Sequence, residues 1–284
     1  WFSVPTQQGI DRCTVVAAVV PELDLIIGVH THTVIPTGRR EGRVLTTQTG
    51  SRLRYVGVTT VTTKKGKVQG IENHLVDLDS IDTSPKYTEL AQKITSNPEP
   101  ARSIGSVASD MNQIDLMNLF ADIIRFGTGS QIAFYHLGSM RISELKTGDV
   151  TVVDVFSAGP FKNAPVTMMM TLEEIKELIM NKFNSTGGES HTMDIYPSGM
   201  TYTVLTDGNG DATDIVFQTN AKPDRKGYYK VAMSDYVDGQ YDFPKRGTGT
   251  PSGLFITDLV MDYFAKNSPV KADTENRVKI EQNY

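Results

Sequence analysis

A change of residue pattern near residue 84 constrains the fold of this chain more than any other feature. The first 70 residues contain runs such as YVGVTTVTT, whose valines and threonines favour strands. Ser84 and Pro85 then supply an N-cap and a first-turn proline for a helix, and Pro98 and Pro100 stop that helix. We therefore predict two domains, a β-rich one first, joined by a partly helical connector with helix breakers at its ends.

Helical and strand patterns alternate beyond residue 100. Apolar residues at helical spacing predict helices over Leu116–Ile124 and Ser252–Lys266, and Thr171 with Glu174 forms a capping box that begins another. The runs predicted as strands are QIAFYHLG, TVVDVF, APVTMMMT, TYTVLT, DIVFQT and YYKVAMS. This alternation predicts an α/β (α+β) fold with a mixed sheet in the second part of the chain.

Composition excludes several classes of protein. With 284 residues and 39% hydrophobic content, the chain is long enough for one large or two modest cores. The net charge of -5, without runs of like charge, argues against a nucleic-acid polymer as partner. No apolar stretch approaches the roughly 20 residues of a membrane span. The chain begins at Trp1 and not at methionine, so we expect a processed or truncated product.

The run DLIIGVHTHT, residues 24–33, ends an apolar strand in glycine and then places His30 and His32 one residue apart. Loops that follow strands are accessible and rigidly mounted, which suits ligand residues. Neutral imidazole binds zinc, manganese, iron or nickel. Two such histidines can face one metal site, or they can be surface or hydrogen-bonded residues.

This run resembles the last metal-binding motif of the calcineurin-like metallophosphoesterases, in which an apolar strand ends in glycine, glycine, histidine, a small residue and histidine. Residues 131–163, QIAFYHLGSMRISELKTGDVTVVDVFSAGPFKN, resemble the signature region of the 5'-nucleotidase C-terminal domain. The order and spacing of the later segments YKVAMSDYV and ENRVKI also agree. The whole chain thus resembles the 5'-nucleotidase and 2',3'-cyclic-nucleotide phosphodiesterase family.

The resemblance implies a division of the chain. Residues 1–70 would be the distal, β-rich part of a metallophosphoesterase sandwich, and residues 71–100 a connector with a helix. Residues 101–284 would be the substrate-binding C-terminal domain with its mixed sheet. A hinge at the connector would move this domain towards the metal ions.

The resemblance also implies site residues. His30 and His32 match two ligands of a dinuclear centre of divalent ions such as zinc or manganese. Arg141, in GSMR, matches an arginine that helps to bind substrate. Phe161 and Asn163, in GPFKN, match an aromatic ring and an amide that contact the nucleoside.

Tyr236, in SDYVDG, matches the second aromatic residue, so Phe161 and Tyr236 would sandwich a base. Two rings grip a planar base without recognising each of its polar edges. Ordinary core packing of these two rings, and a solvated or salt-bridged Arg141, are the alternatives.

Several positions depart from the family pattern. Gln7 stands in a histidine slot of the metal site, and glutamine is a poorer ligand for such ions, so we expect an altered or weakened site. His136 replaces an asparagine, and Asn112 stands near a second substrate arginine. Asp242, in GQYDF, is the candidate for an aspartate of the closing motif. His136 and Asp242 are therefore further substrate-binding candidates.

The metal-binding motifs that open the family's catalytic domain are absent from this sequence. Hydrolysis with two metal ions needs both ions about 3.5 to 4 Å apart, and two histidines cannot hold such a pair. We therefore expect the main catalytic histidine and aspartate residues in an N-terminal portion outside this chain. The chain would be the distal part of a larger enzyme, or the partner of a separate metal domain.

The function that these features predict is metal-dependent hydrolysis of nucleotide phosphoesters, of the 5'-nucleotidase type, in nucleotide catabolism. The resemblance implies a nucleotide or nucleoside as ligand and a location in the periplasm or at the cell surface. One alternative is a nucleotide-binding or interaction module whose catalysis has decayed. The other is a phosphoesterase whose substrate is not a nucleotide.

The acidic segment DGNGDATD, residues 207–214, allows two interpretations. Asp207, Asn209 and Asp211 match the first positions of a calcium-binding loop, but Ala212 replaces its glycine and Gln218 its closing glutamate. We therefore predict a hairpin tip between the strands TYTVLT and DIVFQT.

Overall fold

The computed structural model describes residues 12–29, 31–185 and 191–282, and the chain divides into two compact units, residues 1–96 and 97–284. Helices and mixed sheets confirm the predicted α/β class. Among the described residues, none of the helices combines the length and apolar character needed to cross a bilayer.

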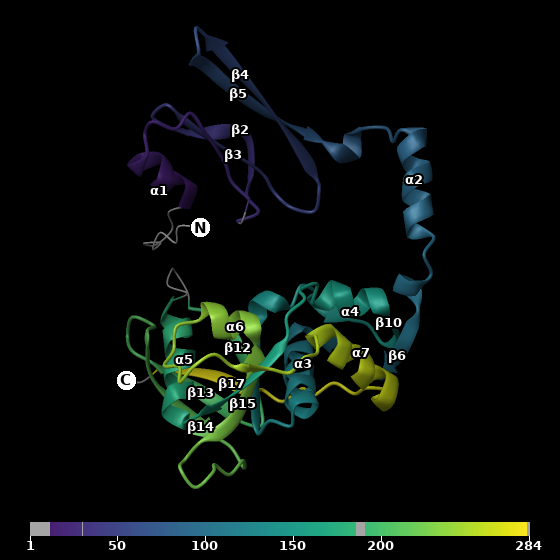
Figure 1. Cartoon of the computed structure of the whole chain (residues 1–284), viewed down its shortest axis with the longest axis vertical. Coiled ribbons are helices and arrows are strands. Elements are labelled where there is room, and N and C mark those ends of the chain that lie inside the picture. Colours follow the sequence, from purple (N-terminus) through teal and green to yellow (C-terminus); the bar gives the residue numbers. More distant parts are fainter. Residues whose placement is uncertain (1–11, 30, 186–190, 283–284) are drawn as a thin grey trace. The chain divides into compact units, whose positions relative to one another are not determined.

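The first unit is β-rich, as the valine and threonine runs predict. Its elements are α1 (Arg12–Val19), β1 (Leu25–Ile27), β2 (Val34–Glu41), β3 (Val44–Thr49), β4 (Tyr55–Lys64), β5 (Lys67–Asp77), a 3-10 turn (Leu78–Ser80) and α2 (Pro85–Thr95) (Figure 1). Strand β3 is central in one sheet, parallel to β1 and antiparallel to β2. Strands β4 and β5 form a separate antiparallel hairpin.

Helix α2 begins where the sequence predicts, with Ser84 as N-cap and Pro85 in the first turn. Its apolar residues Tyr87, Leu90 and Ile94 are exposed. Strand β5 crosses the predicted domain boundary at residue 70, because it stays paired with β4 through Asp77. The proposed limits of the connector, residues 71–100, stay a prediction.

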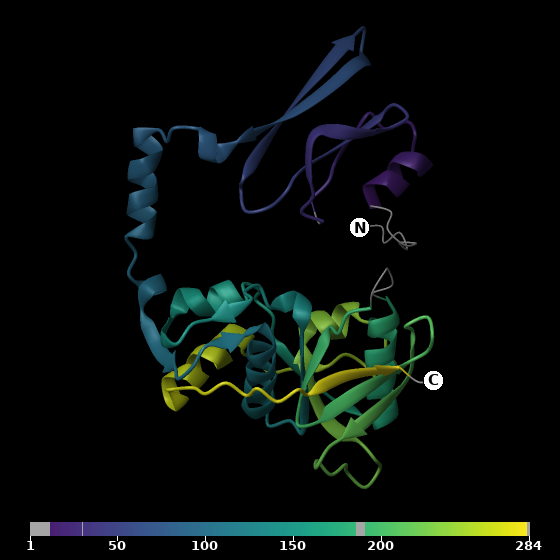
Figure 2. The same cartoon turned by 180° about the vertical axis from the view of Figure 1, so that it is seen from behind.

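The second unit contains the longer helices and the larger sheets (Figures 1 and 2). Its elements are a 3-10 turn (Glu99–Ala101), β6 (Ser103–Val107), β7 (Met111–Asn112), α3 (Gln113–Thr128), β8 (Ile132–His136), a 3-10 turn (Leu137–Ser139), β9 (Glu144–Leu145), β10 (Gly148–Thr151), α4 (Val152–Ala158), β11 (Pro165–Met170), α5 (Leu172–Ser185), β12 (Ile195–Ser198), β13 (Thr201–Thr206), β14 (Ala212–Gln218), β15 (Tyr229–Ser234), α6 (Asp235–Gln240), β16 (Thr250–Pro251), α7 (Ile256–Asn267) and β17 (Val278–Gln282).

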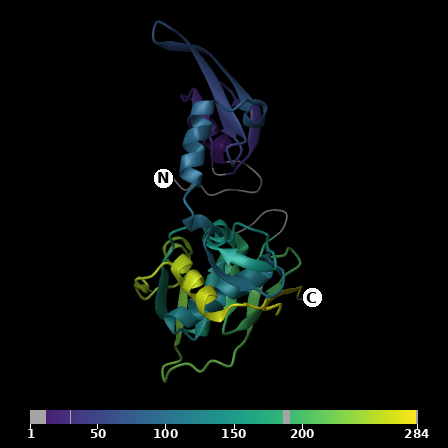
Figure 3. The same cartoon turned by 90° about the vertical axis from the view of Figure 1, so that its right-hand side faces the viewer.

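Strand β8 lies inside a five-stranded sheet of order β12-β8-β15-β11-β16, parallel to β15 and antiparallel to β12. Its side chains alternate between two hydrophobic cores, as the pleat of a strand requires. Ala133 and Tyr135 join the core that contains α3 and α7, which pack together on one face (Figure 3). Ile132 and Phe134 join the core that contains α5. The sheet is therefore the middle layer of the second unit.

The run TVVDVF was predicted as a strand, and this prediction is wrong. Only Thr151 ends a strand, β10, while the rest forms α4. The Thr151 amide donates to the Asp154 carboxylate at 2.8 Å, and the Thr151 hydroxyl donates to the same oxygen at 2.5 Å. This capping box begins a helix in spite of the strand preference of the valines.

The acidic segment after β13 is a hairpin tip, as predicted. The Asp207 carboxylate accepts hydrogen bonds from the backbone amides of Asn209 at 2.8 Å and Asp211 at 3.0 Å. An aspartate that accepts bonds from amides a few residues ahead is typical of a tight turn. The carboxylate of Asp207 therefore stabilises the turn by binding backbone amides.

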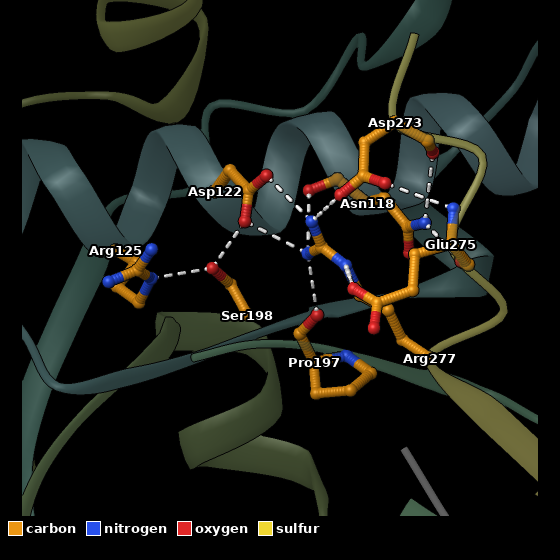
Figure 4. A network of polar contacts seen from close by, with 8 residues as sticks. All are labelled: Asn118, Asp122, Arg125, Pro197, Ser198, Asp273, Glu275 and Arg277. Carbon is orange, nitrogen blue, oxygen red and sulfur yellow. Dashed lines mark hydrogen bonds and ion pairs between the residues drawn. The ribbon is translucent and has the colours of Figure 1, made fainter. Parts of the chain in front are cut away.

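Arg277 attaches the last strand of the unit to α3 (Figure 4). It is 7% exposed, and its guanidinium donates two bonds to the Asp122 carboxylate, at 2.9 and 2.8 Å. It also donates to the carboxylate of Asp273 and, at 3.0 Å, to the carbonyl of Pro197. Bidentate pairing keeps the buried cation neutralised and fixes its orientation.

The network continues from Asp122 to the end of α3. Ser198, which is fully buried, donates to the Asp122 carboxylate and accepts a bond of 2.7 Å from Nε of Arg125. Strand β17 begins directly after Arg277 and runs parallel to β13 (Figure 2). The network therefore connects β12, α3 and the C-terminal segment.

We expect the substitution Arg277→Met to lower the free energy of unfolding by about 3 kcal/mol, because it removes the buried cation that pairs with the half-buried carboxylate of Asp122 and with Asp273. Lys266→Met is the matched control, since Lys266 pairs with Asp262 at the i,i+4 spacing of the Arg277–Asp273 pair, but on the surface. That change should cost about 0.5 kcal/mol or less. Urea unfolding followed by circular dichroism measures both, and equal losses would contradict the structural role of Arg277.

Candidate functional site

His136 is the last residue of β8 and the centre of the candidate site. Its backbone pairs with Ile195 of β12, and its side chain is 5% exposed. Strand β8 is packed on both faces, and its pairing with β12 extends to His136, so its final side chain is held in one place. His136, which replaces an asparagine of the family pattern, is therefore held firmly in the fold.

Three tyrosine rings surround the His136 imidazole, and the first is that of its neighbour in β8, Tyr135, at a centroid separation of 6.0 Å. Tyr236, in the first turn of α6, stacks on the imidazole with a centroid separation of 5.0 Å and an interplanar angle of 13°. Tyr241 presents an edge to His136 at 6.0 Å and to Tyr236 at 6.2 Å. Tyr236 nevertheless remains 48% exposed, so part of its ring is open to a ligand.

Tyr241 is held in turn by charged groups. Its hydroxyl donates to the carboxylate of Asp194, and the Lys182 ammonium lies 4.8 Å from the centre of its ring. Burial, and next the negative charge of Asp194, raise the pKa of Tyr241 far above its ordinary value. Tyr241 therefore stays protonated, and it remains a hydrogen-bond donor to Asp194.

Ser139 connects His136 to the loop that precedes β11. Its hydroxyl lies 2.9 Å from Nε2 of His136 and accepts a bond of 3.4 Å from the side-chain amide of Asn163. The carbonyl of Asn163 also accepts a bond of 2.9 Å from the amide of Ile256, at the start of α7. The loop is thus fixed from two sides.

Phe161 of this loop is in contact with Arg141. The Cζ atom of Arg141 is 5.0 Å from the ring centroid of Phe161, a cation–π contact, and Phe161 is 38% exposed. The backbone amide of Arg141 donates to the carbonyl of Ala158 at 2.8 Å, which ties the arginine to the end of α4. Phe161, Asn163 and Ser139 help to line a cavity of about 10 Å³, roughly the space of one water molecule.

The predicted residues are thus brought together only in part. Arg141 contacts Phe161, and Asn163 and His136 both contact Ser139. Asp242 follows Tyr241 and is exposed. Its backbone carbonyl accepts a bond of 3.2 Å from Asn181 of α5, so the contact that holds this residue is made by its backbone and not by its carboxylate.

Asn112 is the N-cap of helix α3. Its side chain caps α3 by accepting bonds from the amides of Ile114 at 2.8 Å and Asp115 at 3.1 Å. This capping accounts for an amide at the position where the sequence comparison placed it near a substrate arginine.

The metal-ligand prediction concerns the first unit. His32 is exposed, with a positive φ of 55° that non-glycine residues seldom adopt. His30 and Gln7 lie outside the described residues. Within the ranges that are described, no three histidine, cysteine, aspartate or glutamate side chains lie close enough to hold a metal ion. The described residues alone therefore do not form the dinuclear centre.

The residues that sequence reasoning missed are Ser139, Tyr241, Asp194 and Lys182. Ser139 lies in the quoted LGSMR segment, three residues after His136, so a turn at the end of β8 would have brought the two together. Nothing in the local sequence joins Asp194 or Lys182 to Tyr241, because these contacts depend on how α5 and β12 pack.

A large depression on the second unit lies elsewhere. Its volume is about 810 Å³, and its walls include Asp122, Arg125, Gln218, Asn220 and Arg277. None of the predicted site residues lines it. Asp122 and Arg277 neutralise each other there, so its main charges already have partners. Size alone therefore does not make it the candidate site.

Comparison with known proteins gives the chain a family. The profile of the 5'-nucleotidase C-terminal domain matches residues 93–246, more than half of the chain. A 5'-nucleotidase-related protein of Glossina morsitans morsitans is 26% identical over 318 residues, covering 91% of this chain and 56% of that protein. The chain therefore spans little more than half the length of this curated relative.

Two solved structures have a similar fold. The 5'-nucleotidase precursor of Thermus thermophilus has a TM-score of 0.64 at 21% identity, covering 90% of this chain and 59% of that one. A Staphylococcus aureus protein assigned as a 5'-nucleotidase has a TM-score of 0.71 at 17% identity, covering 94% and 58%. At these identities the likeness supports the fold.

The environment of His136 predicts a dependence of stability on pH. Burial is the main cause that lowers the pKa of His136 from 6.5 to about 4; the negative charge of Asp194 opposes this shift, and the positive charges of Lys182 and Arg141 contribute to it. Between these two values the unfolded chain binds a proton that the folded chain does not. The stability from this residue is therefore complete above pH 6.5 and is lost as the pH falls towards 4.

We expect the free energy of unfolding to fall by about 3 kcal/mol more in the wild type than in His136→Phe when the pH is lowered from 7 to 4. The variant keeps an aromatic ring beside Tyr236 but cannot titrate. Urea unfolding at several pH values measures the difference between the two proteins. Parallel curves would show that His136 does not titrate as a buried neutral group.

Proposed function

Because the chain belongs to the family of the 5'-nucleotidase C-terminal domain, we propose that its second unit binds the nucleoside part of a nucleotide. In the complete protein this binding would serve the metal-dependent hydrolysis of a nucleotide phosphoester. The chain itself would be the substrate-binding distal portion of that enzyme.

One observation carries the proposal: two predicted substrate segments far apart in sequence are connected through the contacting side chains of His136 and Ser139. Ser139 contacts Asn163, two residues from Phe161, and it also contacts His136, on which Tyr236 stacks. Both aromatic residues keep an exposed part, 38% for Phe161 and 48% for Tyr236. Partly exposed rings beside hydrogen-bonding groups suit a planar base with polar edges.

The roles of the proposed contacts follow from their chemistry. Phe161 and Tyr236 would hold the two faces of the base by stacking, at about 1 to 3 kcal/mol per ring. The Asn163 side chain can both donate to and accept from a base or ribose edge. Arg141 would bind a phosphate or ribose oxygen, because a guanidinium forms charge-assisted bonds with such groups. His136 would lie beneath Tyr236, and Asp242 would lie at the exposed margin.

Arg141 and the base would compete for one ring. The guanidinium lies over the Phe161 ring, so a base that stacks on that face must displace it. A phosphate of the same ligand would attract the displaced cation. The nucleotide should therefore bind more tightly than the nucleoside, since it gives Arg141 a new partner.

The metal ions belong to the proposal for the complete protein. When bound, divalent ions such as zinc or manganese would activate a water molecule and neutralise phosphate charge. His30 and His32 of this chain would be two of the ligands. The remaining ligands would come from outside the described residues, in the N-terminal metallophosphoesterase portion that the family resemblance implies.

The proposal includes the domain division and a location. Residues 1–70 would complete a metallophosphoesterase sandwich, with residues 71–100 as connector and residues 101–284 as the substrate-binding domain. The periplasm or the cell surface is the proposed location, supported by the precursor form named for the Thermus thermophilus relative.

A nucleotide-binding module with decayed catalysis is the second candidate. It is favoured by the use of Asn112 as a helix cap near a position where the family resemblance implies a substrate arginine. Gln7, which replaces a metal-binding histidine, points the same way. A phosphoesterase for a non-nucleotide substrate is the third, because the segment with Asp242 departs from the family pattern.

We expect this chain, without added metal, to bind AMP and adenosine in isothermal calorimetry, with AMP the tighter ligand. Phe161→Ala and Tyr236→Ala should each weaken adenosine binding by about tenfold or more, because each removes one stacking ring. Phe126→Ala is the matched control, since Phe126 is 58% exposed on α3 and is not a predicted contact. It should leave the affinity unchanged.

The calorimetry also has contradicting outcomes. Absence of binding to any nucleoside or nucleotide would remove the nucleotide part of the proposal and favour a different phosphoester. Equal losses in Phe126→Ala and the two site variants would mean that the aromatic residues act through stability and not through contact.

Hydrolysis by the complete protein separates the leading candidate from the decayed module. We expect AMP to be hydrolysed in the presence of manganese or zinc, and the activity to disappear on treatment with a chelator and return with the metal. If the complete protein binds AMP and holds no stoichiometric metal after loading, the decayed module is the correct function.

A further inference from the structure

We propose that His136 and Ser139 form a positioning pair that sets the separation between Tyr236 and the Phe161–Asn163 loop, and thereby the affinity for the base. The pair would act on the proposed nucleoside site by holding its side chains in position, so the inference rests on that site. Neither residue needs to touch the ligand, because each holds one of the groups that would.

The pair stands on a buried part of the unit. His136 ends β8, whose residues are all buried, and Ser139 closes the 3-10 turn that follows. Ser139 is 2% exposed, so its hydroxyl has little solvent to bond to. Backbone bonds tie this turn on both sides: Leu137 donates to the Asp194 carbonyl at 2.7 Å, and Met140 donates to the Leu137 carbonyl at 3.0 Å.

The imidazole orients Tyr236. Their near-parallel stacking at 5.0 Å gives the inner face of Tyr236 a fixed support. Tyr241 supports both rings from the edge, and its own position is fixed by the bond to Asp194. The ring that would contact the base is therefore held by a chain of contacts that begins beside β12.

The Ser139 hydroxyl orients Asn163. A serine hydroxyl donates one bond and accepts others, so Ser139 can donate to Nε2 of a neutral imidazole while it accepts from the Asn163 amide. An imidazolium could not accept at Nε2. The buried position of His136 favours the neutral ring, which gives the two bonds one consistent direction.

The charged groups around the imidazole come from each element packed on it. Asp194 immediately precedes β12, Lys182 comes from α5, and Arg141 follows the 3-10 turn; these three act on the ring electrostatically. Tyr236 and Tyr241 face it from α6 and the residue that ends that helix. Burial, Lys182 and Arg141 lower the pKa of the imidazole against the opposing charge of Asp194, so the neutral ring is favoured.

The pair is chemically distinct from a general stability contact. A structural bond lost anywhere in the core would lower stability without a special effect on ligand affinity. A lost positioning bond would free the Asn163 amide and shift the Phe161 ring relative to Tyr236. Two rings hold a base well only at one separation, so the affinity should fall together with the order of the loop.

The test compares two serine variants of the 284-residue chain in adenosine calorimetry and thermal unfolding. We expect Ser139→Ala to weaken adenosine binding by about tenfold, because it removes the bonds to His136 and Asn163 that would hold the two sides of the site in place. Ser198→Ala is the matched control, because Ser198 is equally buried and bonded to Asp122 and Arg125, outside the proposed site. It should lower the melting temperature to a similar degree and leave the affinity unchanged.

A second variant tests the coupling. His136→Phe keeps a ring beneath Tyr236 but removes the ring nitrogen that bonds to Ser139, so it should weaken adenosine binding by about as much as Ser139→Ala. Because both changes break the same bond, the double variant should be no weaker than either single variant by more than about twofold.

The outcomes separate this inference from the proposed function. If the wild-type chain binds no nucleoside, the proposed function fails and the inference fails with it. If the wild type binds adenosine and Ser139→Ala binds it equally well, the positioning pair is wrong while the nucleoside site stands. Equal loss of affinity in Ser139→Ala and Ser198→Ala, or multiplied losses in the double variant, would also overturn the pairing.

Discussion

Strand β8 is buried on both faces, pairs with β15 at its start and with β12 up to its last residue, and the candidate site lies where that strand ends. Its apolar residues divide between two cores, so neither core can shift without moving the strand. His136 is the last residue of this strand and is therefore held in place. The turn up to Ser139 then connects it to the loop with Asn163 through side-chain hydrogen bonds. A site that binds a flat ligand between two rings needs such a fixed reference, because stacking falls off steeply with separation.

Two buried polar networks stabilise the second unit in different ways. Around Arg277 the charges are formal and paired, so the cation is neutralised and the network ties strand β17 to the core. Around His136 the contacts lead to two partly exposed residues: Tyr236, which stacks on the imidazole, and Asn163, which bonds to Ser139. The first network has its main charges already paired. The second holds side chains that still have open faces and unused bonding capacity, which is the property of a binding site.

The sequence predicted those parts of the fold that local signals determine. The capping box at Thr171 and the N-cap with proline at Ser84 marked α5 and α2. The same kind of box occurs at Thr151 and Asp154, and there the valines that follow it misled the prediction towards a strand. The site was predictable only as separate segments. What joins them is tertiary: the stacking of Tyr236 on His136 and the Tyr241–Asp194 bond depend on packing between elements far apart in the sequence, which no local pattern encodes.

The most direct test of the nucleoside site is photolabelling of the chain with 8-azido-AMP, followed by peptide mass spectrometry. The label is on the base, so it reports where the base lies. We expect it in peptides that contain Phe161 or Tyr236, and we expect excess AMP to prevent it. Protected labelling of the peptide with Gln218 and Asn220, in the wall of the large depression, would contradict the assignment and move the ligand to that other face.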